Sequence, residues 1–246
     1  MNYKIKEMSW VEFDRRRKET KTVIIPTGSI EVYGPHLPLG TDSIVAEALA
    51  DRIAEKFDSL ISPNIELNDA SSLIGFPGTI NINRENFIGT LENLVTSLVN
   101  YGFENFLFIS GHGGSVDMTS SLCKKFQRES GVKCAQIDWW RFAAANSDDI
   151  LQYKGQMAHG HASECGTSVM LYLRPDLVDM AKAEKVLPKS EYSEIFKDII
   201  RYIPFDEKTH NGTIGDATIG TTEKGKQLIE KCVNRIVSFM EYEFIK

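Results

Sequence analysis

The chain has 246 residues, of which 42% are hydrophobic and 25% charged, an ordinary balance for a soluble globular protein of one large or two small domains. It carries 28 Lys and Arg against 34 Asp and Glu, a net charge of −6, which argues against a nucleic-acid binder because such proteins present a clustered basic surface. No stretch approaches the ~18 apolar residues of a membrane span, and the N-terminal segment lacks the signal-peptide pattern. The four cysteines are scattered without a C-x-x-C pair, which disfavours a disulfide scaffold and a thiolate zinc site. We therefore expect a cytoplasmic protein without nucleic-acid or membrane partners.

Apolar runs alternate along the chain with amphipathic segments, which is the pattern of strands joined by helical crossovers. The apolar runs predict strands over residues 22–27, 60–65, 105–110 and 133–140. The segments with helical spacing predict helices over residues 43–57, 85–101, 116–129, 164–173 and 223–244, with Asp42 or Ser43 capping the first. Residues 183–211 follow neither pattern, and the loop around residues 70–83 is long enough to be a candidate functional loop. The alternation predicts a single α/β domain over residues 1–246 with a mostly parallel sheet.

Metal-type ligands follow the two clearest strands and recur in a third segment. The strand over 22–27 leads into a Gly-rich loop, the strand over 105–110 leads into Gly-His-Gly-Gly, and the third segment begins His-Gly-His. Together these segments contain Glu31, His36, Asp42, His112, His159, His161 and Glu164. Because ligands of open parallel sheets bind just beyond the carboxyl ends of the strands, we expect the segments to converge. Carboxylates with neutral imidazoles suit Zn²⁺, Mn²⁺ or Fe²⁺, and a catalytic ion keeps one position open for a water whose pKa it lowers.

Four motifs, in this order, resemble those of the creatininase (creatinine amidohydrolase) family. They are GSIEVYGPHLPLGTD after the first strand, GHGG after the strand over 105–110, HASECGTS at the start of the helix over 164–173, and NGTIGDATIGTTEKGK towards the C-terminus. The resemblance implies a three-layer α/β/α sandwich, a divalent metal site, and hydrolysis of a C–N bond in a small amide or cyclic amide by a metal-activated water that attacks the carbonyl. It also implies a small-molecule substrate and a homo-oligomer, often a hexamer.

The resemblance places one metal ion on three residues that are intact in this chain, namely Glu31, Asp42 and His112. A second metal in two-metal members takes a first-motif His, the same Asp, and a carboxylate two residues past the second-motif His. Those positions hold Tyr33 and Gly114 here, and the frequent Glu of the third motif is Gly166. A neutral phenol is a poor ligand for a divalent ion because its pKa is ~10. We therefore expect one tightly bound divalent metal ion per chain, Zn²⁺, Mn²⁺ or Fe²⁺.

The other motif residues receive candidate roles from the same resemblance. Glu164 is the candidate general base, or a ligand to a weak second site, and His161 is the candidate proton donor to the leaving nitrogen. Tyr33 is the candidate hydrogen-bond donor to the oxyanion, in place of a second Lewis acid. His36 is a candidate substrate contact. The pair Trp139-Trp140 is a candidate wall of the substrate pocket, although packing in the core explains an aromatic pair equally well.

Other functions remain open on the sequence alone. The same fold would also serve a hydrolase of a formamide or of a cyclic keto-sugar. Alternatively, the chain is a non-catalytic ligand-binding protein that keeps the metal for its structure, or the altered positions reflect drift after a loss of catalysis. An exchangeable water on the metal favours an enzyme, whereas a closed shell of four protein ligands favours a structural site.

Overall fold

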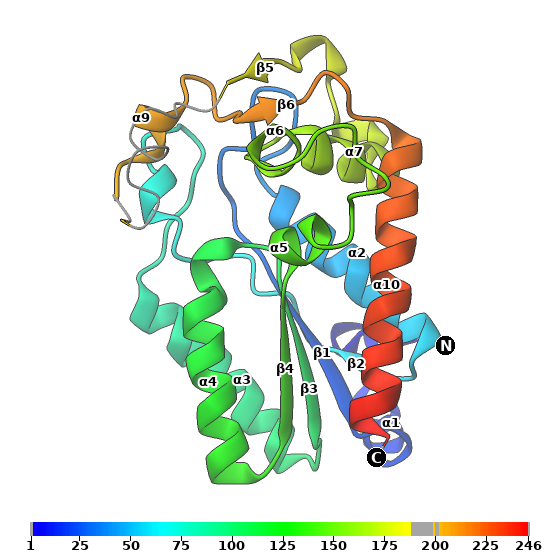
Figure 1. The fold of residues 1–246 in the computed structure, drawn as a ribbon. Helices are drawn as coiled ribbons and strands as arrows, with labels where there is room; N and C mark the ends of the chain where they lie inside the picture. Colours follow the sequence, from blue (N-terminus) through cyan, green and yellow to red (C-terminus); the bar gives the residue numbers. More distant parts are fainter. Residues whose placement is uncertain (1, 188–198, 200–201, 246) are drawn as a thin grey trace.

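The computed structural model describes residues 2–187, 199 and 202–245. At its centre lies a sheet of parallel strands in the order β2-β1-β3-β4 (Figure 1). The strands are β1 (Thr22–Thr27), β2 (Leu60–Ile61), β3 (Asn105–Ser110) and β4 (Lys133–Asp138). A helix joins each strand to the next in the chain, as parallel pairing requires. The parallel sheet predicted from the alternating pattern is confirmed.

Helices cover both faces of this sheet. Successive side chains of a strand point to opposite faces, so each strand contributes to two separate cores. In β3, Phe106 and Phe108 pack into one core, whereas Leu107 and Ile109 pack into the other. The helices that close the first core are α3 (Arg84–Asn100) and α4 (Val116–Ser130), and those that close the second are α2 (Thr41–Lys56), α7 (Glu164–Leu173) and α10 (Thr222–Phe244). These layers form the α/β/α sandwich that the resemblance implied (Figure 1).

Two strands are shorter than the sequence predicted. Strand β2 ends at Ile61 instead of residue 65, because Pro63 has no N–H to donate to the ladder, and pairing with β1 resumes only at Ile65. Strand β4 ends at Asp138, and the aromatic pair that follows begins helix α5 (Trp139–Ala144). The directions of the two tryptophan side chains are therefore set by the geometry of a helix and not by that of a strand.

The helix boundaries also differ in one way that affects the site. Helix α2 begins at Thr41, so Asp42 lies within its first turn and does not cap it. Helix α1 (Trp10–Glu19) is capped by Ser9, and α3 is capped by Asn83, whose side chain accepts from a main-chain N–H 2.9 Å away. Among the described helices, none is both long and apolar enough to cross a membrane.

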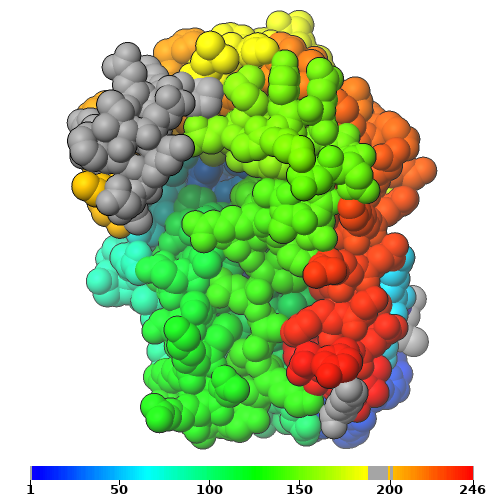
Figure 2. Space-filling model, in the orientation of Figure 1, coloured from blue at the N-terminus to red at the C-terminus, as the bar shows by residue number. Residues whose placement is uncertain are grey.

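The carboxyl ends of β1, β3 and β4 point towards a layer of short elements (Figure 1). This layer contains α6 (Gln156–His159), α9 (Phe205–Lys208) and the antiparallel pair β5 (Lys185–Val186) and β6 (Gly215–Asp216). Part of the stretch 183–211, for which no element was predicted, lies outside the described residues, namely 188–198 and 200–201. Figure 2 shows a hollow beside this layer, with blue-coloured chain from the N-terminal part of the sequence at its floor.

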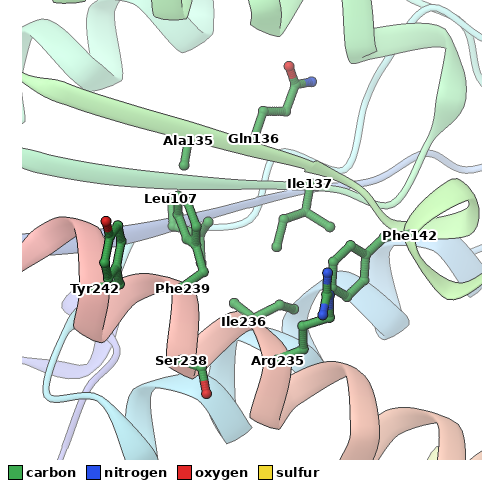
Figure 3. Close-up of a pocket in the computed structure, with 10 residues that line it drawn as sticks. All are labelled: Leu107, Ala135, Gln136, Ile137, Phe142, Arg235, Ile236, Ser238, Phe239 and Tyr242. Atoms are coloured by element: carbon green, nitrogen blue, oxygen red, sulfur yellow. The ribbon is translucent and has the colours of Figure 1, made fainter. Parts of the chain in front are cut away.

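A separate apolar groove of about 470 Å³ lies between strand β4 and helix α10 (Figure 3). Its lining includes Leu107 and Ile137 from the sheet, Phe142 from α5, and Ile236 and Phe239 from α10. None of the sequence-predicted metal ligands lines it. The groove is therefore distinct from the site to which the motifs contribute.

Candidate metal centre

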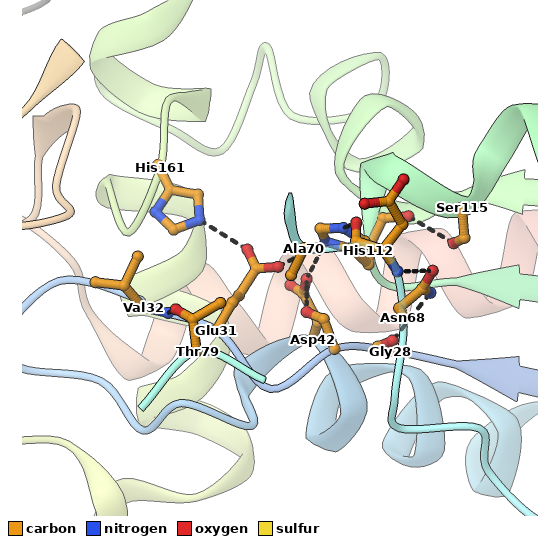
Figure 4. Close-up of polar contacts among 12 residues, drawn as sticks. Gly28, Glu31, Val32, Asp42, Asn68, Ala70, Thr79, His112, Ser115 and His161 are labelled. Carbon is orange, nitrogen blue, oxygen red and sulfur yellow. Dashed lines mark hydrogen bonds and ion pairs between the residues drawn. The ribbon is translucent and has the colours of Figure 1, made fainter. Parts of the chain in front are cut away.

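Three buried side chains meet beyond the carboxyl ends of β1 and β3 (Figure 4). Glu31 lies in the loop after β1, Asp42 in the first turn of α2, and His112 directly after β3. One candidate ligand atom from each residue lies within 4.8 Å of the others. Nδ1 of His112 is 2.7 Å from Oε2 of Glu31 and 3.3 Å from Oδ2 of Asp42. The structure thus brings together the three residues predicted as ligands of one metal.

These three groups form a coupled acid–base cluster. Burial alone would raise the pKa of Glu31, but the hydrogen bonds and charges of His112 and His161 outweigh burial and lower this pKa well below its ordinary value. Burial, together with the Glu31 charge, raises the pKa of Asp42. Burial disfavours the charged form of His112, yet contacts with Asp42 and Glu31 raise its pKa well above the ordinary value. Two buried carboxylates at this separation require a cation beside them, which is either the imidazolium or a metal ion.

The donor atoms fit a divalent cation. Oε2 of Glu31 is buried and makes no aligned hydrogen bond, although it faces Nδ1 of His112. Nε2 of His112 lies 2.9 Å from the main-chain oxygen of Asp69, and it carries a proton because a carbonyl only accepts. In the neutral ring the lone pair is then on Nδ1, which faces both carboxylates. Two carboxylates and one imidazole form a donor set suited to Zn²⁺, Mn²⁺ or Fe²⁺ with positions left for water or substrate.

Asp42 is held through both of its oxygens. Oδ2 accepts a hydrogen bond from the hydroxyl of Ser29 at 2.9 Å, and Oδ1 accepts one from Nε1 of Trp140 at 3.0 Å. The first turn of α2 adds the favourable interaction of a negative charge with a helix N-terminus. The oxygen of Asp42 that does not face His112 is therefore occupied by an indole N–H.

Gly114, where two-metal members carry a carboxylate, has no room for a side chain. A Cβ atom at this position would lie 2.4 Å from Nε2 of His112 and 2.7 Å from the main-chain oxygen of Asp69. Both neighbours are held by the hydrogen bond between them. A carboxylate at position 114 is thus excluded by the contact that orients His112.

Tyr33 and Gly166, the other two departures, are neighbours in space. A Cβ atom at Gly166 would lie 3.3 Å from the ring of Tyr33, so the glycine leaves room for the aromatic ring. The Tyr33 ring also lies 5.8 Å from the ring of Trp140, centroid to centroid. Burial, together with the charges of Asp42 and Glu31, raises the pKa of Tyr33 well above its ordinary value, so the phenol stays protonated.

His161 lies beside the ligands rather than among them. Its Nε2 is 3.1 Å from Oε1 of Glu31, and its Nδ1 is 2.8 Å from the main-chain oxygen of Gly212. Both partners are hydrogen-bond acceptors. The ring also contacts the rings of Tyr33, at 4.4 Å between centroids, and of Phe205, at 4.7 Å. Two polar contacts and two ring contacts therefore hold its orientation.

Glu164 lies apart from the ligand cluster. Its Oε1 accepts from the main-chain N–H of Gln152 at 2.8 Å and from Nζ of Lys224 at 2.7 Å, and its Oε2 accepts from the N–H of Tyr153 at 3.1 Å. The carboxylate is fully buried. These contacts tie the loop before α6 to α7 and α10, and they use both oxygens that a general base would need.

The three candidate substrate contacts, His36, Trp139 and Trp140, lie in different surroundings. Nε2 of the buried His36 lies 2.9 Å from the hydroxyl of Thr167 on α7, and burial lowers the pKa of His36 to about 4. Trp139 is fully buried within the core that α2, α7 and α10 close. Trp140 is the member of this group whose side chain reaches a metal ligand. His159, which received no role, faces the hydroxyl of Ser147 at 2.7 Å.

Sequence reasoning missed three contributors to the site, namely Ser29, Asp69 and Phe205. Ser29 lies within the first motif, but nothing in the pattern distinguishes its hydroxyl. Asp69 contributes a main-chain carbonyl, which every residue type has, so only the length of the adjacent loop signalled this region. Phe205 lies in the stretch for which the sequence predicted no element.

Comparison with known proteins bears directly on this cluster. The family model of creatininase, described as creatinine amidohydrolase, matches residues 6–240. The chain belongs to the creatininase family. A solved structure described as "Creatininase Mn" is 23% identical and superposes with a TM-score of 0.85 over 99% of each chain. At that identity, the likeness establishes the fold, which is the sandwich that the motifs implied.

Relatives within the creatininase family carry different activities. A mycofactocin precursor peptide peptidase of Mycolicibacterium smegmatis is 29% identical over 230 residues, which cover 86% of this chain and 81% of the relative. A creatinine amidohydrolase of Pseudomonas putida is 25% identical over 257 residues, covering 97% and 96%. A 3-dehydro-scyllo-inosose hydrolase of Thermotoga maritima is 25% identical over 246 residues, covering 91% and 78%. The chain is thus a hydrolase of the creatininase family, as the motifs predicted.

Proposed function

We propose that this hydrolase uses a divalent metal ion to cleave a C–N bond in a small amide or cyclic amide. The observation that carries the proposal is the buried cluster of Glu31, Asp42 and His112 with His161 beside it. A divalent cation bound there would polarise a carbonyl group and lower the pKa of a water enough for attack at neutral pH. The donor set suits Zn²⁺, Mn²⁺ or Fe²⁺.

We assign to His161 the role of proton donor to the leaving nitrogen. Its side chain is 18% exposed, compared with 3% for Glu31 and 7% for His112, so of these three it has the freest access to a substrate. The proton on Nε2 is the one that faces the cluster, and it passes to the nitrogen as the C–N bond breaks. Nε2 would then present a lone pair to the Glu31 carboxylate. The ring regains a proton from the carboxylic acid product, whose hydroxyl came from the attacking water.

We assign oxyanion stabilisation to the hydroxyl of Tyr33. Its raised pKa keeps the proton on the phenol, and the carboxylates of Asp42 and Glu31 lie close to it. A buried O–H donor at this place is able to stabilise the charge that develops on the carbonyl oxygen. It would take over part of the work that a second Lewis acid does in two-metal enzymes.

We infer further that one metal ion per chain is the working state. The crowding at Gly114 and the indole N–H on Oδ1 of Asp42 support this inference, since each removes a ligand from a second ion. Metal analysis of protein purified without chelators should give one equivalent per chain. Two equivalents held after dialysis would contradict it.

We infer supporting roles for Glu164, His36 and Trp139. The hydrogen bonds of Glu164 to Lys224 and to two loop amides, and that of His36 to Thr167, serve to hold segments together. Trp139 packs within the core. A cation bound at the cluster would lower the pKa of the water enough for its proton to leave to solvent before attack, so the attack does not require Glu164 as a general base.

A hydrolysis screen tests the proposed activity. Protein loaded separately with Mn²⁺, Zn²⁺ and Fe²⁺ is assayed on small lactams, formamides and cyclic keto-sugars, with the metal-free protein as control. We expect turnover of a lactam or another small amide. Turnover of a keto-sugar alone would favour the second candidate, which the similarity to the inosose hydrolase supports. Failure on every class, by protein that binds the metal, would favour the non-catalytic reading.

A further inference from the structure

We propose that Asn68 is a positioning residue of the metal centre, because its side chain and its main-chain oxygen hold the N–H groups on either side of the Asp69 carbonyl that contacts His112. This inference rests on the proposed metal site. The oxygen fixes the imidazole so that Nε2 carries the proton and Nδ1 presents its lone pair to the metal. Asn68 stands two residues before the long loop at 70–83, and no motif includes it.

The contact between Asp69 and His112 determines which ring nitrogen is a ligand. Nε2 of His112 lies 2.9 Å from the Asp69 oxygen, whereas Nδ1 faces Glu31 at 2.7 Å and Asp42 at 3.3 Å. A metal-bound histidine generally donates its second N–H to a carbonyl or carboxylate, which fixes the ring and its tautomer. If the carbonyl moved away, the ring would be free to rotate and to exchange the roles of its nitrogens.

The side chain of Asn68 holds the N–H of Asp69 from the inside of the protein. It is fully buried, and its Oδ1 accepts from that N–H at 2.9 Å. Its Nδ2 donates to the main-chain oxygen of Gly28 at 3.1 Å. Gly28 begins the loop that carries Glu31, so one side-chain amide links the loop of the first ligand to the residue whose carbonyl orients the third (Figure 4).

The backbone on either side of Asp69 is anchored as well. The main-chain oxygen of Asn68 accepts from the N–H groups of Ala70 and Ile82, at 3.0 and 3.1 Å. The N–H of Ala70 also lies 2.8 Å from Oδ1 of Asn81. The Ala70 N–H belongs to the same peptide group as the Asp69 carbonyl, so these bonds hold that carbonyl in its orientation towards His112. Asn68 takes part in them through both its side chain and its backbone.

The test compares Asn68→Ala with Asn105→Ala. Asn105 is also a buried amide, at the amino end of β3, with Nδ2 donating to the hydroxyl of Thr22 at 3.3 Å. Zn²⁺ affinity is measured by chelator competition, and unfolding by urea gives the stability of each variant. We expect Asn68→Ala to bind Zn²⁺ about 10- to 100-fold more weakly, and Asn105→Ala to keep the wild-type affinity at a similar loss of stability.

A second readout follows the His112 ring directly. In nitrogen–proton spectra of metal-free protein, the proton on Nε2 should be protected from exchange in the wild type and exposed in Asn68→Ala. A folded Asn68→Ala with wild-type affinity and a protected Nε2 proton would overturn the inference. Absence of Zn²⁺, Mn²⁺ and Fe²⁺ binding by the wild type would instead refute the proposed function, while the ring spectrum would still decide the role of Asn68.

A further variant, Asn68→Ser, covers the case in which Asn68→Ala does not fold. It keeps a small hydroxyl in place of the amide, too short to contact both Asp69 and Gly28. It should lose Zn²⁺ affinity and protection of the Nε2 proton, and wild-type behaviour of a folded Asn68→Ser would overturn the inference.

Discussion

The two halves of the candidate site balance charge in different ways. The ligand half consists of Glu31, His112 and Oδ2 of Asp42, and the aromatic half consists of Tyr33, Trp140 and Gly166 around Oδ1 of Asp42. The ligand half gathers buried carboxylates that require a cation. In the aromatic half, Gly166 leaves room for the Tyr33 ring, and an indole N–H donates to the remaining oxygen of Asp42. One side of Asp42 is therefore balanced by a cation, and the other is satisfied by an uncharged N–H donor.

The largest effect is expected when the ligand half is broken. His112→Ala removes the imidazole ligand, and the Lewis acid it helps to hold is worth several kcal/mol, so kcat/KM should fall by about 10³-fold or more. Metal analysis and kinetics measure both losses. The matched control is His210→Ala, since that side chain is 70% exposed and lies outside the cluster. Full activity of His112→Ala with metal supplied would contradict the proposed site.

A smaller effect is expected in the aromatic half from Tyr33→Phe. The change removes one buried O–H donor and keeps the ring, so kcat should fall by about 10²-fold while the metal content stays the same. Tyr202→Phe serves as the control because Tyr202 is 89% exposed. Unchanged kcat in Tyr33→Phe would show that the oxyanion is stabilised elsewhere.

Trp140→Phe tests whether the hydrogen bond from the indole N–H stabilises the buried carboxylate of Asp42. The substitution leaves Oδ1 of Asp42 without its donor, and an unpaired buried charged acceptor costs about 3 kcal/mol, measured as the free energy of unfolding in urea. Trp10→Phe is the control, since Trp10 is 81% exposed. Equal stability of the two variants would mean that Asp42 does not depend on this hydrogen bond.

The smallest effect concerns His36, which lies outside both halves. Burial lowers its pKa to about 4, below the ordinary value of 6.5, so the folded state favours the neutral ring. The resulting stability is fully present above pH 6.5 and is lost as the pH falls towards 4, by up to about 2 kcal/mol after allowance for solvent screening. Urea unfolding of the wild type and His36→Gln across pH 4–7 measures the difference. Parallel pH profiles would exclude this contribution.

The sequence predicted the sheet and the convergence of ligands for physical reasons that act locally. Uninterrupted apolar runs such as 105–110 are buried on both faces, and the rule that parallel strands end at one edge brings Glu31 and His112 together. The end of the second strand was harder to predict from the sequence, because the effect of Pro63 depends on whether its missing N–H would face a neighbouring strand.

The direction of individual side chains could not be predicted. His161 and Glu164 are three residues apart in one motif, yet His161 reaches Glu31 whereas Glu164 reaches Lys224. Trp139 and Trp140 are adjacent, yet one fills the core and the other reaches Asp42. Spacing shows that such residues are neighbours, but only the start of a helix and the packing around it decide where each one points.

The crowding at Gly114 has a consequence for any attempt to engineer a second metal ion into this site. A substitution that places a carboxylate there would push apart His112 and the Asp69 carbonyl, and so damage the ligand half before a second ion could bind. Such a design would first have to shift the backbone around Asp69, which the buried Asn68 helps to hold. A single substitution at position 114 is therefore not enough.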